Sequence, residues 1–197
     1  RGVSFCIVTA LALPAAADQV LFKNVNIFNG KDDKLIRNQS VLVEDKLIKQ
    51  ISAGSIDAAG ATVIDGGGRT LTPGFIENHA HLMLMGPTLP AMEAGTTWED
   101  FAIHATRMAE MYLMQGFTTV RDAGGANGGL RRAIDAKQIV GPRYYPSGAF
   151  LGTRGGHADF ADFTSPVGGS TNMGRLNLAQ EVSGVADVYK YGRNNFR

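Results

Sequence analysis

The chain contains little cysteine and no strong excess of charge, and both absences exclude functions. Its single cysteine is Cys6, near the N-terminus, so the rest of the chain offers no disulfide, no thiol nucleophile and no cysteine ligand for zinc. With 19 basic and 18 acidic residues the formal net charge is +1, and no basic patch with interleaved aromatic residues is present. We therefore expect neither a nucleic acid nor an acidic membrane surface as a partner.

Long apolar runs are also scarce, and the clearest one lies at the N-terminus. Residues 3–13 are mostly apolar and follow Arg1, and the small-residue stretch 14–17 (PAAA) precedes Asp18. This order is typical of a secretory signal peptide, and the run is short for a membrane-spanning helix. We predict a signal peptide over residues 1–17, a periplasmic or secreted protein, and no membrane association after its removal. A buried N-terminal strand or helix is the alternative.

Residues 18–71 predict short strands and turns. Residues 20–28 alternate only loosely between apolar and polar types, and the Asn29-Gly30 pair is a turn signal. Residues 40–44 and 47–51 flank a two-residue connection and predict a tight hairpin. A β module of about fifty residues is thin for an independent core.

From residue 72 onward, strand patterns alternate with helical ones. We expect strands over 75–82, 117–121 and 144–151, and helices over 96–115, 128–138 and 181–196. In the longest helix, Thr96 and Glu99 form a predicted capping box, and Gly116 ends the helix. This order implies parallel strands, either in an open doubly wound sheet or in the first part of a (β/α)8 barrel. No Gly-rich fingerprint joins the first strand to its helix, which argues against a dinucleotide-binding fold.

Two histidines close the first of these strands. His79 and His81 are two residues apart, so they project from the same side of a strand. They lie at its C-terminal end, where a barrel places its active site. Two imidazoles can bind one divalent ion, and nitrogen ligands favour Zn²⁺. His104, on the margin of the apolar stripe of the longest helix, is expected to be structural.

Three segments resemble one protein superfamily, in the order in which that superfamily has them. Residues 71–81 (LTPGFIENHAH) resemble the first barrel strand of the amidohydrolase superfamily, which reads Pro-Gly-hydrophobic-Ile-Asp-x-His-x-His. Residues 118–125 (TTVRDAGG) resemble the second barrel strand of the subgroup with imidazolonepropionase-like enzymes and Xaa-Pro or Xaa-Arg dipeptidases. Residues 155–159 (GGHAD) resemble the loop after its third strand. Glu77 departs from the pattern, since the family usually has Asp there.

This resemblance implies the fold and the metal site. The fold is α/β: the first three βα units of a (β/α)8 TIM barrel over residues 72–197, preceded over residues 18–71 by the N-terminal portion of a small β-sandwich module. His79 and His81 would bind the more buried ion of a site with one or two divalent ions, with Zn²⁺ expected. The family's other ligands and its general base lie on later strands. We therefore expect no catalytic residue in this chain, and no activity of the chain alone.

The implied function is metal-dependent hydrolysis of amide bonds in a small molecule or a dipeptide. A dipeptidase or carboxypeptidase-like enzyme that releases an amino acid is the leading hypothesis. The alternatives are a cyclic amide hydrolase of the imidazolonepropionase type, an inactive metal-binding protein and a small-metabolite binding module, and a homo-oligomer is left open. His157 and Arg154 are the candidate substrate-binding residues. Asp122 and Glu77 are the candidates for supporting the metal ligands.

Overall fold

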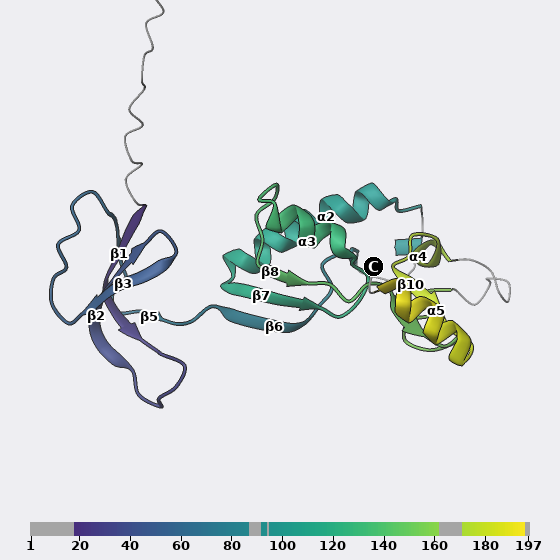
Figure 1. The fold of residues 1–197 in the computed structure, drawn as a ribbon, viewed down its shortest axis with the longest axis horizontal. Helices are drawn as coiled ribbons and strands as arrows, with labels where there is room; N and C mark the ends of the chain where they lie inside the picture. The colour runs from purple at the N-terminus through teal and green to yellow at the C-terminus, as the bar shows by residue number, and fades with distance from the viewer. Residues whose placement is uncertain (1–17, 87–91, 94, 162–170, 196–197) are drawn as a thin grey trace, which may run out of the picture. The chain divides into compact units, whose positions relative to one another are not determined.

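The computed structural model describes residues 18–86, 92–93, 95–161 and 171–195 (Figure 1). The chain divides into two compact units, Arg1–Pro73 and Gly74–Arg197. The predicted signal peptide, residues 1–17, lies outside the described residues. Within the described ranges, no helix has the length and apolar character needed to cross a membrane.

The first unit is a five-stranded sheet built around β1 (Gln19–Ile27). This strand pairs antiparallel with β2 (Ile36–Glu44) and parallel with β4 (Thr62–Asp65) and β5 (Thr70–Leu71). At the far edge, β3 (Leu47–Ser52) pairs antiparallel with β2. The predicted hairpin is therefore confirmed.

A bulge explains why β1 alternates so loosely. Its register on β2 shifts between Phe22 and Val25, around Asn24, which has a positive φ of 53°. In a regular strand Leu21 and Val25 would point to the same face. Here Leu21 packs with Leu42 in one small cluster, and Val25 packs in another. The extra residue thus places the apolar side chains of β1 on both faces of the sheet.

The second unit begins with three parallel strands in sequence order. These are β6 (Phe75–Ala80), β7 (Phe117–Asp122) and β8 (Arg143–Tyr145). The connecting helices, α2 (Trp98–Met114) and α3 (Gly128–Asp135), both lie against one face of this sheet (Figure 1). The predicted α/β fold with parallel strands joined by helices is confirmed.

The core of this unit lies between the sheet and its helices. Phe101, Ala105 and Ala109 form the buried stripe of α2, and they share one cluster with Val120 of β7 and Tyr144 of β8. Because the strands are parallel, their C-terminal ends share one edge of the sheet, and the loops that follow them gather there. This edge carries the candidate site.

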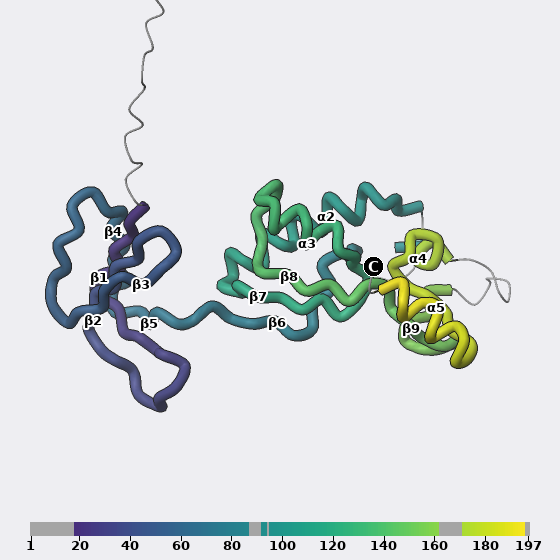
Figure 2. Tube along the Cα trace, viewed as in Figure 1, coloured from purple at the N-terminus to yellow at the C-terminus, as the bar shows by residue number. Residues whose placement is uncertain are grey.

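The last part of the chain corrects two expectations. The strand predicted over 144–151 is wrong as a single element, because β8 ends at Tyr145 and β9 (Phe150–Gly152) pairs instead with β10 (Ala179–Glu181) in a separate parallel sheet. Pro146 and Gly148, with φ of +83°, stand in the connection, and proline cannot donate a ladder hydrogen bond. Figure 2 traces this path from β8 to β9.

The final helix also begins later than predicted. The helical pattern was expected from residue 181, but β10 extends to Glu181, and helix α5 is Val185–Asn195. A short helix, α4 (Asn172–Arg175), precedes β10. The C-terminal end of α5 is tied back to β9, because the Asn195 side chain accepts a hydrogen bond from the amide of Ala149 and donates one to its carbonyl, both at 3.0 Å.

The capping box of α2 lies one residue later than predicted. Thr97, not Thr96, is the N-cap: its hydroxyl accepts from the amide of Asp100 at 3.4 Å, and the Asp100 carboxylate accepts from the amide of Thr97 at 2.9 Å. The backbone and side-chain hydrogen bonds from Thr97 lower the pKa of Asp100. The carbonyl of Thr96 accepts instead from the Asn172 side chain at 2.8 Å. Because Asn172 is so distant in sequence, the residues around Thr96 give no indication of this contact.

At the other end of α2, Gly116 with φ of +93° follows the helix, as predicted.

Replacing Thr97 with alanine should lower the free energy of unfolding by about 1 kcal/mol, since the first turn loses the acceptor for its orphan amide. Chemical denaturation followed by circular dichroism measures the change. Thr97→Ser keeps the hydroxyl and should stay within a few tenths of a kcal/mol of the parent, roughly the spread among good caps. Equal losses in both variants would show that the hydroxyl does not stabilise the helix.

Candidate metal centre

The two predicted metal ligands lie together at the end of β6. Their ring centroids are 5.0 Å apart, with an interplanar angle of 81°. Two imidazoles bound to one tetrahedral zinc ion, at zinc–nitrogen distances of about 2.0–2.1 Å, would have centroids about 5 Å apart. The spacing of His79 and His81 therefore fits a shared divalent ion.

β6 is irregular at the first of these histidines, and the second, His81, directly follows the strand. Glu77 pairs with Val120, but the next printed pair is Ala80 with Asp122, so β6 has one residue more than β7 over this stretch. The Glu77 carboxylate accepts a hydrogen bond from the amide of His79 at 2.8 Å and so spans the irregular segment. The longer side chain at this position reaches the backbone of its own strand, next to the first histidine.

The environment of His81 determines which ring nitrogen is free. Its Nδ1 lies 3.2 Å from the carbonyl oxygen of Gly124, in the loop after β7. A carbonyl oxygen can only accept, so Nδ1 carries the hydrogen and donates it. In the neutral ring Nε2 then keeps its lone pair, which is the state that binds a metal ion. Nε2 of His81 is thus the nitrogen that is available to a metal ion.

Asp122 organises the two loops around this histidine. It is fully buried at the end of β7, and its carboxylate accepts from the amide of Leu82 at 2.8 Å and from that of Gly124 at 2.9 Å. Burial raises the pKa of Asp122, and the two amide hydrogen bonds partly oppose this. The carboxylate ties the residue after His81 to the residue whose carbonyl holds His81.

A buried tyrosine lies behind this carboxylate. The Tyr144 hydroxyl is inaccessible to solvent and lies beside the Asp122 carboxylate. Burial, and next the negative charge of Asp122, raise the pKa of Tyr144 far above its usual range. The hydroxyl therefore stays protonated. The sequence patterns did not single out Tyr144.

The two predicted substrate-binding residues lie in and beside a turn after β9. His157 is exposed on a turn that Asp159 closes, since its carboxylate accepts from the amides of Gly155 at 2.7 Å and Ala161 at 3.0 Å. These hydrogen bonds lower the pKa of Asp159. Arg154 makes an ion pair with Glu181 at 3.7 Å, with both side chains about one-third exposed. Their contact with a substrate stays a prediction.

The histidine pair alone does not complete a metal site. Among the residues that the structure describes, no three His, Cys, Asp or Glu side chains form a group that could hold a metal ion. Structural zinc sites have four protein ligands and catalytic ones usually three, so the pair needs further ligands.

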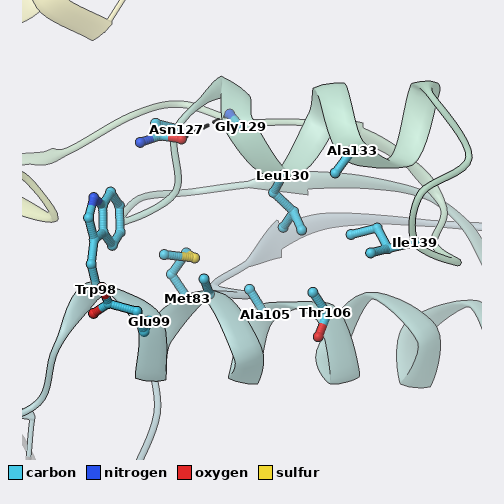
Figure 3. Close-up of a pocket in the computed structure, with 11 residues that line it drawn as sticks. Met83, Trp98, Glu99, Ala105, Thr106, Asn127, Gly129, Leu130, Ala133 and Ile139 are labelled. Atoms are coloured by element: carbon cyan, nitrogen blue, oxygen red, sulfur yellow. Dashed lines mark hydrogen bonds between the residues drawn. The ribbon is translucent and has the colours of Figure 1, made fainter.

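A separate cavity of about 410 Å³ lies between α2 and α3. Figure 3 shows Leu130 and Ile139 pointing across it toward Ala105 and Thr106 of α2. Its lining is mostly apolar and includes no histidine. Neither of the two candidate metal ligands lines it, so the candidate metal centre is not placed there.

Comparison with known proteins gives a family and several relatives. The amidohydrolase family profile matches residues 70–192. A dihydroorotase from Trichlorobacter lovleyi is 35% identical over 91 residues, 46% of this chain and 18% of the relative. An imidazolonepropionase from Mycolicibacterium smegmatis is 35% identical over 75 residues, 36% of this chain and 19% of the relative. A solved prolidase structure, complexed with N-methylphosphonate-L-proline, is 30% identical with a TM-score of 0.72, and the match covers 90% of this chain and 44% of the prolidase. The chain thus spans less than half the length of these proteins.

Proposed function

The chain belongs to the amidohydrolase family, and from this premise we propose that the protein is a metal-dependent hydrolase of amide bonds whose metal site includes His79 and His81. One observation carries the proposal. The two rings have the spacing that one ion requires, and the Gly124 carbonyl takes the Nδ1 hydrogen of His81, so that Nε2 is the free nitrogen.

The chain's own residues would orient the two imidazole rings toward the ion. Each neutral imidazole offers one lone pair, and the hydrogen bond to Gly124 places the ring hydrogen of His81 on Nδ1, which leaves Nε2 for the ion. Asp122 holds the Gly124 loop in place. A divalent ion at this site would supply Lewis-acid polarisation of the amide carbonyl and a lower pKa for the attacking water.

We propose a dipeptide as the substrate, with release of an amino acid. The similar prolidase, whose structure contains a proline derivative, supports this choice, and its match covers nine-tenths of the present chain. The second candidate is a cyclic amide, which the similarity to an imidazolonepropionase and to a dihydroorotase supports over a shorter part of the chain. We also propose that the protein is exported, because of the signal-like residues 1–17.

A substrate panel with metal removal tests the function. The intact protein should lose hydrolysis of dipeptides on treatment with a chelator and regain it on addition of Zn²⁺, because the bound ion would lower the pKa of the attacking water. Dipeptides with C-terminal proline or arginine should be cleaved, and cyclic amides such as dihydroorotate should not. Cleavage of the cyclic amides alone would favour the second candidate. Dipeptide cleavage that survives complete metal removal would refute the metal-dependent mechanism.

A further inference from the structure

One aromatic side chain lies against the candidate ligand His81 without belonging to its strand or to the neighbouring one. Phe150, the first residue of β9, has its ring centroid 5.1 Å from that of His81, at an interplanar angle of 34°. The His81 ring is thus in contact with the His79 ring, with the Gly124 carbonyl at Nδ1 and with the Phe150 ring.

The Phe150 ring fits a slot formed by two glycines. A Cβ atom built on Gly124 would lie 2.5 Å from Cδ1 of Phe150, a separation that no real side chain adopts. One built on Gly125 would lie 3.5 Å from Cε2 of the same ring. Phe150 therefore lies directly on the backbone that supplies the carbonyl for His81. Any side chain at Gly124 would displace the ring or the loop.

The loop that carries the Gly124 carbonyl is held on several sides. Asp122 accepts from the amide of Gly124, and the amide of Gly125 donates to the carbonyl of Gly148 at 2.8 Å. The preceding residue, Ala123, donates to the carbonyl of Ala80 at 2.7 Å. The position of the Gly124 carbonyl, which accepts from His81, is therefore fixed by these hydrogen bonds. What remains to be set is the rotation of the imidazole toward it.

Phe150 is itself anchored from the C-terminal side. Its amide donates to the carbonyl of Leu178 at 2.9 Å, it pairs with Ala179 of β10, and its ring contacts that of Phe160 at 5.9 Å. The Phe150 backbone is thus fixed by β10, and its ring contacts a second aromatic side chain besides His81.

Resting on the proposed function, we propose that Phe150 is a positioning residue for the metal ligand His81. Its ring limits rotation of the imidazole, keeps Nδ1 on the Gly124 carbonyl and so presents Nε2 to the ion. An imidazole without this wall can turn about its Cβ–Cγ bond. This rotation moves Nδ1 away from the Gly124 carbonyl, and the ring hydrogen is then free to shift to Nε2. The apolar ring offers no hydrogen bond that would compete with the carbonyl.

The test is the tautomer of His81 in the metal-free intact protein. Long-range ¹H–¹⁵N correlation spectra of the histidine rings are recorded at about pH 8.5, two units above the ordinary histidine pKa. The His81 signals are identified by their loss in His81→Gln. The parent should show His81 with its hydrogen on Nδ1, and Phe150→Leu should show exchange between the two tautomers. Phe150→Tyr, which keeps the planar ring, should resemble the parent. A single Nδ1-protonated tautomer in Phe150→Leu would overturn the proposal.

Zinc affinity gives a second readout, with a matched control. Phe150→Leu should weaken zinc binding about tenfold, the lower end of the effect of residues that orient metal ligands. Phe117→Leu makes the same change in a ring that contacts Phe75 and Tyr112, and it should leave zinc affinity unchanged whatever its effect on stability. If zinc affinity fell equally in Phe150→Leu and Phe117→Leu, Phe150 would contribute only packing and would not position His81.

Failure of the inference and failure of the proposed function give different results. If His81→Gln does not weaken zinc binding, the proposed metal site is wrong, and the tautomer spectra of the metal-free protein still decide the role of Phe150. If His81→Gln weakens zinc binding and Phe150→Leu changes neither the tautomer nor the affinity, the metal site stands and the positioning role does not.

Discussion

Substituting alanine for His81 should lower the zinc affinity of the intact protein by more than about 100-fold, because loss of a ligand must exceed the 10–100-fold effect of losing a group that only orients one. Amide hydrolysis at a fixed, limiting zinc concentration should fall in parallel. The reason is geometric: His79 would be left as a single nitrogen, without the partner whose ring lies 5.0 Å away. Zinc-binding calorimetry in competition with a chelator measures the change.

Two other histidines provide matched controls for this substitution. His104 lies on α2, and its Nε2 is buried without a hydrogen-bond partner among the described residues, so His104→Ala should change stability and leave zinc affinity within about twofold. His157 is exposed on the turn after β9, and His157→Ala should leave zinc affinity unchanged while raising KM if it meets the substrate. Zinc affinity reduced equally by all three substitutions would remove the special role of His81.

Substituting alanine for Asp122 should have the largest effect on stability, a loss of about 3 kcal/mol in the free energy of unfolding. Two amides, those of Leu82 and Gly124, would lose their acceptor in a region where the carboxylate is fully buried. Each buried and unsatisfied polar group costs about 1–3 kcal/mol. Urea denaturation with a two-state analysis measures the loss.

An exposed carboxylate of the same unit is the control. Asp135 is 63% exposed and lies 3.5 Å from Arg131, one helical turn away on α3. Because exposed ion pairs contribute little, Asp135→Ala should cost less than about 0.5 kcal/mol. If the two alanine variants were equally stable, Asp122 would not be the organising group described above.

The Asp122 effect should also depend on pH in a defined direction. Burial raises the folded-state pKa of Asp122 above its unfolded value. Its contribution to stability is therefore fully present below the unfolded pKa and decreases as the pH rises through the folded pKa. The stability difference between the parent and Asp122→Ala should be larger in mildly acidic solution than at neutral pH. A difference that shrinks on acidification would contradict this account.

The sequence by itself was sufficient for the family, for the order of the elements from β6 to α3, and for the choice of His79 and His81 as candidate ligands. The motifs around residues 71–81 and 118–125 indicated the amidohydrolase resemblance, and the family match at residues 70–192 confirms it. Periodicity predicted α2 closely, because Phe101, Ala105 and Ala109 repeat at the spacing of one helix face and are all buried. The motifs and the helical periodicity each depend on residues that are close to one another in the sequence.

Only the tertiary structure decided how the candidate site is supported. Phe150 reaches His81 from a strand far along the chain, and Asp122 joins the loops after β6 and β7 through backbone amides that have no side-chain signature. The N-cap of α2 is Thr97 and not the predicted Thr96, whose carbonyl accepts a hydrogen bond from the side chain of Asn172, distant in sequence. Such contacts depend on which segments the fold brings together. Hydrophobic period and turn chemistry report on a residue and its near neighbours along the chain, so they identify the ligands of a site more readily than the groups that hold them.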